Sequence, residues 1–321
     1  MTSTGPEAPF ALARYREGDG IRLGLVAGDR IRPLDQDDLG AAGLNDFLAA
    51  DGWDRLEKLV GADGPWRPLS EVTLTAPVEP RHVLQAGANY RTHVIQLIMA
   101  GIAKEDRDVA PEELRTRAER VMDARAASGR AIIFLGLPGC VVGGDEPLVL
   151  PAYSDQHDWE LELAVVIGKE AYRVTPEAAP AHIAGYTIAN DITTRDRVFP
   201  GGVGDMGADW FRSKNAPGFL PTGPFLVPAR FVDPRDARVV LELNGEVMQD
   251  ATTAELIYDV PAIVSDASQT TRLYPGDVIL TGSPAGNGQH WGRFLKDGDV
   301  MTGRISMLGE QVVRCVAAVD S

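Results

Sequence analysis

The stretch Asp158-Trp-Glu-Leu-Glu-Leu-Ala-Val-Val-Ile-Gly168 predicts a strand that carries two carboxylates into a buried core. Successive strand side chains point to opposite faces, so Glu160 and Glu162 share one face. Their side chains start ~6.6 Å apart at a rise of ~3.3 Å per residue, which lets both close on one cation. Carboxylates held that close repel each other unless a positive charge lies between them. The stretch therefore points to a metal site at the entrance of a buried strand.

A third carboxylate comes from Asp191, at the end of the strand predicted over 185–191. Three oxygen ligands without a thiolate suit a hard cation, Mg²⁺ or Mn²⁺, with Ca²⁺ also compatible. The alternative is that Glu160 and Glu162 lie on a solvated sheet face, which is the commoner place for a lone Glu-x-Glu strand. These residues alone leave both interpretations open.

Composition excludes several other classes of function. The 321-residue chain has a formal net charge of -15, which argues against binding nucleic acid or docking on anionic lipid. Its two cysteines, Cys140 and Cys315, form no disulfide framework and no thiolate metal site. We find no signal-peptide pattern and no apolar run long enough to span a bilayer, so we expect a cytoplasmic protein.

The pattern of strands and turns predicts a mixed α/β, β-rich fold dominated by antiparallel strands. Short strands over 9–35 and a helical stretch over roughly 44–59 precede a proline-punctuated segment, 73–80. We therefore expect a small N-terminal α+β domain, 1–78, and a catalytic domain, 79–321. Asn244-Gly245 predicts a tight hairpin in the second domain.

A charged helix is expected over 108–127, with Leu114, Ala118, Val121 and Arg125 on one face. Its apolar stripe is thin. It is either a lid over a site or an outer packing helix, and the sequence does not choose between them.

Five motifs, in this order along residues 80–315, resemble those of the fumarylacetoacetate hydrolase superfamily. They are Asn89-Tyr-Arg-Thr-His93, Asp158-Trp-Glu-Leu-Glu-Leu-Ala-Val-Val-Ile-Gly168, Gly185-Tyr-Thr-Ile-Ala-Asn-Asp-Ile-Thr-Thr-Arg-Asp196, Leu243-Asn-Gly-Glu-Val-Met-Gln249 and Pro275-Gly-Asp-Val-Ile-Leu-Thr-Gly-Ser-Pro284. The resemblance implies a catalytic domain of the β-sandwich or roll type, a divalent metal and commonly a homodimer. It also implies 2-oxo or 2,4-dioxo acid substrates that react through a metal-bound enolate.

The resemblance also assigns roles to individual positions. Glu160, Glu162 and Asp191 would be the metal ligands. The catalytic positions would be His93 as general base, Gln96 beside it, and Lys214 at the substrate or the developing enolate. The substrate-binding positions would be Tyr90, Arg195 and Thr281.

Three positions depart from the pattern of many relatives. Gln96 stands where they have Glu, and a glutamine cannot stabilise an imidazolium by charge. Gly136 stands where they have Lys, and Val198 where they often have Gln. These changes indicate a less polar or differently shaped substrate pocket.

Three functions follow as hypotheses. The first is a metal-dependent hydrolase that cleaves a C–C bond in an acylpyruvate-like 2,4-dioxo acid, as in the catabolism of aromatic compounds. The second is a decarboxylase, isomerase or hydratase of a 2-oxo acid on the same metal site. The third is a metal-binding scaffold without activity. A carboxylate within hydrogen-bond reach of His93 would favour the hydrolase over the second class.

Overall fold

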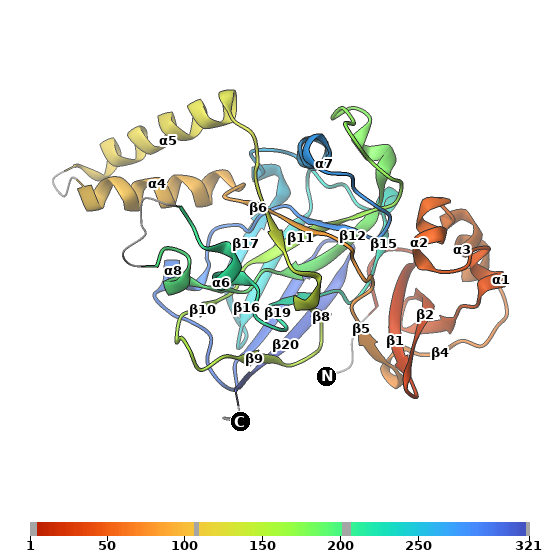
Figure 1. Ribbon diagram of the computed structural model, residues 1–321. Helices are drawn as coiled ribbons and strands as arrows, with labels where there is room; N and C mark the ends of the chain where they lie inside the picture. Colours follow the sequence, from red (N-terminus) through yellow and green to blue (C-terminus); the bar gives the residue numbers. More distant parts are fainter. Residues whose placement is uncertain (1–4, 106–108, 201–206, 319–321) are drawn as a thin grey trace.

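The N-terminal part of the chain forms its own sheet, shown at the right of Figure 1. The computed structural model describes residues 5–105, 109–200 and 207–318. The N-terminal sheet has the strand order β4-β3-β2-β1-β5. Its strands are β1 (Ala11–Glu17), β2 (Gly20–Ala27), β3 (Arg30–Pro33), β4 (Arg67–Pro68) and β5 (Thr73–Thr75). Leu12 of β1 pairs with Leu226 of the larger part, so the domain division at residue 78 stays a prediction.

The helical stretch expected over 44–59 is present, and the chain divides it into two short helices. The short helices here are α1 (Gln36–Leu39), α2 (Leu44–Ala49) and α3 (Trp53–Val60). Asp51 has a φ of 54°, in the left-handed region, and Gly52 caps the start of α3. A left-handed residue cannot continue an α-helix, so Asp51-Gly52 turns the chain between α2 and α3.

Two larger sheets form the β-rich body, and the expected fold class is confirmed. The first has the order β7-β6-β18-β11-β12-β14-β8, with β15 beside β12. Its strands are β6 (Val83–Gly87), β7 (Ile132–Gly136), β8 (Val141–Gly143), β11 (Leu161–Ile167), β12 (Ile183–Asn190), β14 (Leu220–Thr222), β15 (Val227–Pro228) and β18 (Val278–Leu280).

The second large sheet has the order β17-β16-β19-β20-β9. Its strands are β9 (Leu148–Leu150), β16 (Arg238–Leu243), β17 (Glu246–Thr252), β19 (Val300–Ile305) and β20 (Gly309–Ala317), and β10 (His157–Asp158) pairs separately with β13 (Thr193–Thr194). The predicted hairpin is confirmed: Asn244 and Gly245, with φ of 55° and 85°, connect β16 to β17.

Strand β11 is buried on both faces, and the alternation of its side chains decides the direction of Glu160 and Glu162. Leu161 and Leu163 belong to the core between the two large sheets, together with Leu241 of β16. Ala164 and Val166 belong to a second core, on the opposite face of β11. Because side chains alternate along a strand, the even-numbered glutamates point away from the core between the sheets.

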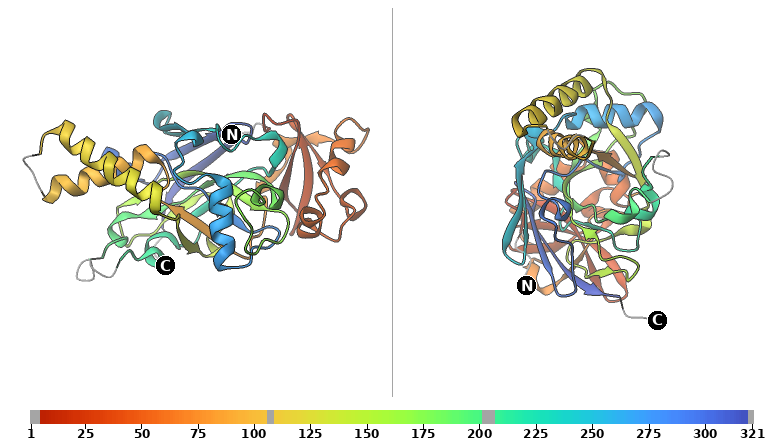
Figure 2. Two further views of the ribbon diagram at one scale, coloured as in Figure 1. Left: turned by 90° about the horizontal axis from the view of Figure 1, so that it is seen from above. Right: turned by 90° about the vertical axis from the view of Figure 1, so that its left-hand side faces the viewer.

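A helical hairpin projects from the body between β6 and β7 (Figure 1, Figure 2). It consists of α4 (Arg91–Glu105) and α5 (Pro111–Ser128), so the charged helix is confirmed. Its expected face is partly wrong: Ala118 and Met122 are buried against α4, while Val121 is 52% exposed. Met122 follows Ala118 by four positions, about one helical turn, so the two side chains share a helix face. The side chain of Arg125 lies outside the described residues.

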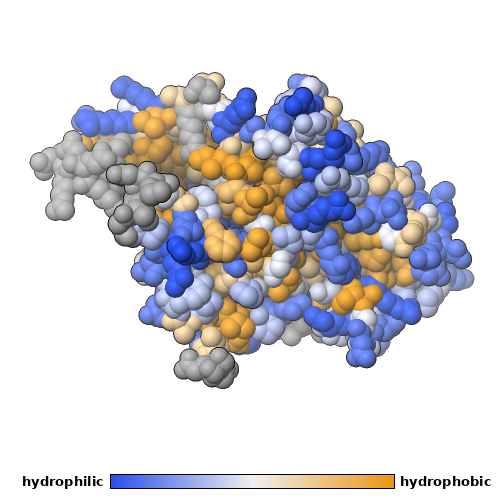
Figure 3. Space-filling view, viewed as in Figure 1, coloured by the Kyte–Doolittle hydropathy of each residue, from blue (hydrophilic) through white to orange (hydrophobic). Residues whose placement is uncertain are grey.

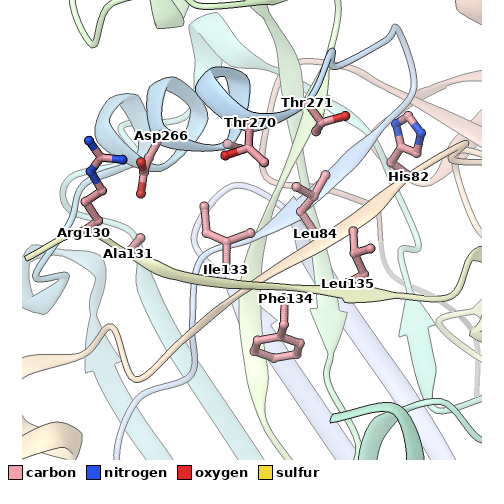
Figure 4. A pocket seen from close by; sticks show the side chains of 11 residues that line it. His82, Leu84, Arg130, Ala131, Ile133, Phe134, Leu135, Asp266, Thr270 and Thr271 are labelled. Atoms are coloured by element: carbon pink, nitrogen blue, oxygen red, sulfur yellow. The ribbon is translucent and has the colours of Figure 1, made fainter.

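Strand β7 is the edge of the large sheet and separates two environments. Figure 4 shows Ile133 and Leu135 bordering a groove of about 490 Å³ beside α7 (Val260–Thr270), while Phe134 points to the opposite face. Apolar surface gathers in the centre of this side of the molecule (Figure 3). The remaining α-helices of the described residues are α6 (Trp210–Lys214) and α8 (Gly288–Trp291). Among the described residues, none of the helices has the length and apolar character to cross a membrane.

Candidate metal centre

Three buried carboxylates converge where β11 and β12 meet. Glu160 directly precedes β11, Glu162 lies within it, and Asp191 directly follows β12. Each offers a carboxylate oxygen, and these atoms lie within 4.8 Å of one another. Antiparallel pairing of Leu161 with Asn190 places the start of β11 beside the end of β12, so the sheet register brings the three together. The solvated alternative for Glu160 and Glu162 is thus wrong: they are 8% and 3% exposed.

Neighbouring groups hold the orientation of these carboxylates. The backbone N–H of Gly282 donates to Glu162 Oε2 at 2.6 Å. The Gln85 side-chain amide, from β6, donates to Asp191 Oδ1 at 2.7 Å. Sequence reasoning missed Gln85, although a single polar residue within the apolar stretch 83–87 was a usable signal. Such contacts fix a ligand in the geometry that a metal ion requires.

Two buried cations also lie in this cluster. The Lys214 ammonium donates to Glu160 Oε2 and to Thr193 Oγ1, both at 2.7 Å, and also bonds Asp191 Oδ2. Arg195 donates from Nε to Asp158 Oδ2 and from Nη2 to Glu160 Oε1, each at 2.6 Å. Lys214 therefore lies at the proposed metal ligands themselves. The substrate-binding role expected of Arg195 stays a prediction, since these two donors already serve carboxylates.

The charges in this cluster do not balance without a further cation. Two cations, Lys214 and Arg195, face four buried carboxylates, which are Asp158, Glu160, Glu162 and Asp191. With all of them ionised, two negative charges remain uncompensated, and a divalent cation would neutralise both. Three oxygen donors of this kind suit Mg²⁺ or Mn²⁺. The residues present thus fit a divalent metal centre.

The pKa shifts show which carboxylates lack compensation. Burial, with Asp191 and Glu160 nearby, raises the pKa of Glu162 well above its usual range. Burial also raises the pKa of Asp191 to about 6 although Lys214 opposes the shift. Burial acts on Glu160 too, but Arg195 and Lys214 outweigh it and lower its pKa. The unbalanced charge is therefore concentrated at Glu162 and Asp191.

His93 reaches the same place from α4, near the root of the helical hairpin. It is 9% exposed and lines the cavity beside the carboxylates. Burial lowers its pKa to about 4, against an opposing effect of Glu160, so the imidazole is neutral at pH 7. Within the described parts of the chain, no carboxylate forms a hydrogen bond or ion pair with it. Gln96 lies one turn further along α4 and is half-buried. Its catalytic role stays a prediction.

A cavity of about 100 Å³ opens onto the cluster. Besides His93 and the charged groups, its lining includes Phe134, Trp210 and Leu97, which sequence reasoning did not single out. Tyr90 and Thr281 are not among the lining residues. Tyr90 is fully buried, and Thr281 Oγ1 donates to the carbonyl of Leu163 at 2.9 Å. Their substrate-binding roles stay predictions, and the geometry gives Thr281 a structural contact.

The comparison with protein families matches the region that contains this site. Residues 82–316 match the model described as fumarylacetoacetate (FAA) hydrolase C-terminal. The chain belongs to the fumarylacetoacetate hydrolase family. The resemblance drawn from the five sequence motifs is thereby confirmed. Members of this family are enzymes that act on small molecules, and a buried acidic triad fits their use of a metal.

Individual members of the fumarylacetoacetate hydrolase family resemble this chain over most of its length. A mitochondrial oxaloacetate tautomerase of Bos taurus is 36% identical over 249 residues, which cover 76% of this chain and 70% of that protein. The crystal structure of a 2-hydroxyhepta-2,4-diene-1,7-dioate isomerase from Mycobacterium marinum matches with a TM-score of 0.71 and 28% identity, covering 97% of this chain and all of the other. Because the bovine protein is mitochondrial, the cytoplasmic location of this chain stays a prediction, as does the homodimer.

A fumarylacetoacetate hydrolase from psychrophilic Exiguobacterium antarcticum matches with a TM-score of 0.74 and 28% identity, over 96% of this chain and 100% of that one. Relatives with similar folds therefore carry names of different reactions. Fold alone does not decide which reaction this family member performs.

Gln85→Leu tests whether the contact to Asp191 matters for metal binding in this family member. The substitution removes the N–H donor at 2.7 Å from Asp191 and puts an apolar side chain of similar size in its place. Metal affinity, measured by titration calorimetry with Mn²⁺, is expected to fall about 10- to 100-fold. Gln269→Leu, at an exposed glutamine on α7, is the matched control. Unchanged affinity in Gln85→Leu would show that Asp191 needs no such support.

Proposed function

We propose that this protein is a metal-dependent tautomerase or isomerase of 2-oxo acids, which belongs to the second class of function expected from its sequence. The observation that carries the proposal is a neutral, buried His93 beside the acidic triad, without a carboxylate partner in the described chain. Such an imidazole can accept a proton from carbon and return it. C–C hydrolysis would require the imidazole to activate water, and Gln96 stands where many relatives have the Glu that would support its charge.

The proposed reaction needs one proton to leave C3 of the 2-oxo acid and to return at oxygen or carbon. A divalent cation held by Glu160, Glu162 and Asp191 would supply a Lewis acid that favours enolisation of the substrate. His93 takes the proton from C3 on one ring nitrogen, and the C–H electron pair moves into the enolate. Lys214, within the same cluster, adds positive charge on the side where the enolate oxygen develops. Protonation of that oxygen by the imidazolium gives the enol.

The names of relatives support this class of reaction. The bovine relative is an oxaloacetate tautomerase and the mycobacterial structure is an isomerase. C–C hydrolysis of an acylpyruvate-like 2,4-dioxo acid is the second candidate, supported by the similarity to a fumarylacetoacetate hydrolase. It shares the metal site and the enolate, and differs in the attack of water.

Proton exchange at C3 measures the proposed step directly. The holoenzyme with Mg²⁺ or Mn²⁺ is incubated with 2-oxo acids in D₂O, and loss of the C3–H signal is followed by NMR. We expect exchange that EDTA abolishes, with no change in carbon skeleton by mass spectrometry. Release of pyruvate and a carboxylic acid from an acylpyruvate would instead establish the hydrolase, and release of CO₂ a decarboxylase.

His93→Gln is expected to slow this exchange by about 10²-fold or more, the usual contribution of a general base. The glutamine keeps a polar group in the cavity but cannot take up a proton at neutral pH. His182→Gln is the matched control, at a histidine that does not line the cavity. Exchange at the wild-type rate in His93→Gln, with metal still bound, would remove His93 as the base.

A further inference from the structure

The cavity has both charged and aromatic lining residues. Glu160, Glu162 and Asp191 form its charged part with Lys214. Phe134 from β7 and Trp210 from α6 line the same cavity and stack on each other, with ring centroids 4.6 Å apart and planes at 12°. Both rings are half-buried and line the cavity. We call this pair the aromatic wall.

The aromatic wall is close enough to meet a substrate held at the metal ligands. The Lys214 ammonium, which bonds Glu160 at 2.7 Å, lies 5.6 Å from the centre of the Phe134 ring and 5.9 Å from that of Trp210. A 2-oxo acid anchored by its carboxylate and oxo group would therefore bring its C3 substituent to the two rings. Leu97 adds further apolar surface to the cavity.

A second carboxylate on the substrate would find no free counter-charge beside the aromatic wall among the described residues. The cations among the described lining residues are Arg195 and Lys214, and both bond carboxylates of the metal cluster. Gly136, which shares a strand face with Phe134, adds no charged side chain to that face. Burying an unpaired carboxylate is costly, whereas an apolar group is favoured by leaving water.

We infer that this site selects 2-oxo acids whose C3 substituent is apolar and planar, such as an aryl group, over those with a second carboxylate. This inference rests on the proposed function for its chemistry and on the aromatic wall for its specificity. It extends the less polar pocket expected from Gly136 and Val198, although neither residue lines the cavity itself.

Binding of two unreactive probes tests the inference without turnover. N-phenyloxamate and N-oxalylglycine share the same oxalyl end but carry a phenyl ring and a carboxylate, respectively, at the other. With the Mn²⁺-loaded protein, calorimetry is expected to give a Kd at least about tenfold lower for N-phenyloxamate. Equal affinity, or preference for N-oxalylglycine, would overturn the inference, as would absence of binding by both probes.

Variants of the aromatic wall connect the preference to these residues. Trp210→Ala and Phe134→Ala are each expected to raise the Kd of N-phenyloxamate about tenfold and to leave that of N-oxalylglycine nearly unchanged. Phe211→Ala, next to Trp210 but 68% exposed, is the matched control. Trp210→Leu serves if Trp210→Ala disturbs α6. An equal loss for both probes would mean that the wall supports the fold and does not select the substrate.

The exchange assay separates this inference from the proposed function. Phenylpyruvate is expected to exchange its C3 protons with a kcat/KM at least about tenfold above that for oxaloacetate. Faster exchange of oxaloacetate would leave the proposed function standing and overturn the inference. Exchange of neither substrate would overturn the proposed function, and the probe affinities would then decide the selectivity of the wall.

Discussion

Glu162→Ala is expected to abolish binding of Mg²⁺ and Mn²⁺ and to lower turnover at least about 10³-fold. Lewis-acid assistance contributes several kcal/mol to a transition state, and every ~1.4 kcal/mol corresponds to a factor of ten in rate. Glu162 is one of three carboxylates that converge on the site, so its removal leaves two of the three proposed ligands. Metal binding is measured by titration calorimetry and turnover by C3 exchange.

Glu162→Gln separates the loss of a ligand charge from damage to the fold. The amide keeps the volume and an oxygen that can accept from the Gly282 N–H. It also removes one of the two uncompensated negative charges, so the Tm of the metal-free protein in EDTA is expected to hold or rise. The increase of Tm on adding Mg²⁺, expected for the wild type, should disappear.

Glu177→Gln, at an exposed glutamate, is the matched control for this experiment. It should keep metal binding, turnover and the metal-dependent rise in Tm. The metal hypothesis is wrong if Glu162→Ala retains full turnover that EDTA does not affect.

Lys214→Met is expected to destabilise the metal-free protein by about 3–5 kcal/mol, the usual cost of leaving buried partners of an ion pair without their counter-charge. Lys214 is 4% exposed and its ammonium bonds Glu160, Asp191 and Thr193. Methionine fills a similar volume but leaves three metal-ligand carboxylates with Arg195 as their remaining cation. Denaturant unfolding in EDTA measures the loss.

A divalent metal should restore much of this stability without restoring activity. The added ion supplies the missing positive charge to Glu160, Glu162 and Asp191, so Mg²⁺ is expected to raise the Tm of Lys214→Met more than that of the wild type. Turnover should remain low, because the charge beside the developing enolate is gone.

Lys169→Met, at an exposed lysine, controls for the general effect of removing a charge. It is expected to change neither stability nor turnover by a measurable amount. Full turnover in metal-loaded Lys214→Met would assign Lys214 to balancing charge in the metal-free protein and remove it from the reaction.

Local sequence pattern was sufficient to single out three carboxylates that the structure brings together, and to indicate the family. The alternation Glu-Leu-Glu-Leu followed by Val165, Val166 and Ile167 specifies a strand with one acidic face entering a core, because side-chain direction along a strand has a period of two. The hairpin at Asn244-Gly245 is equally local, since these residues accept positive φ. The helical stretch over 44–59 is local as well, but the pattern did not reveal its division at Asp51, which adopts a left-handed conformation.

The environment of these residues depended on contacts between segments far apart in the chain. Lys214 reaches Asp191 from a separate helix, and Gln85 reaches it from a strand 106 positions away. Packing between distant elements also decides that His93 has no carboxylate hydrogen-bonded to it among the described residues, and that Phe134 stacks on Trp210. Periodicity reports which way a side chain points from its own backbone. Only the tertiary structure shows what it meets there, and that neighbour sets its charge, its pKa and the substrate group it can accept.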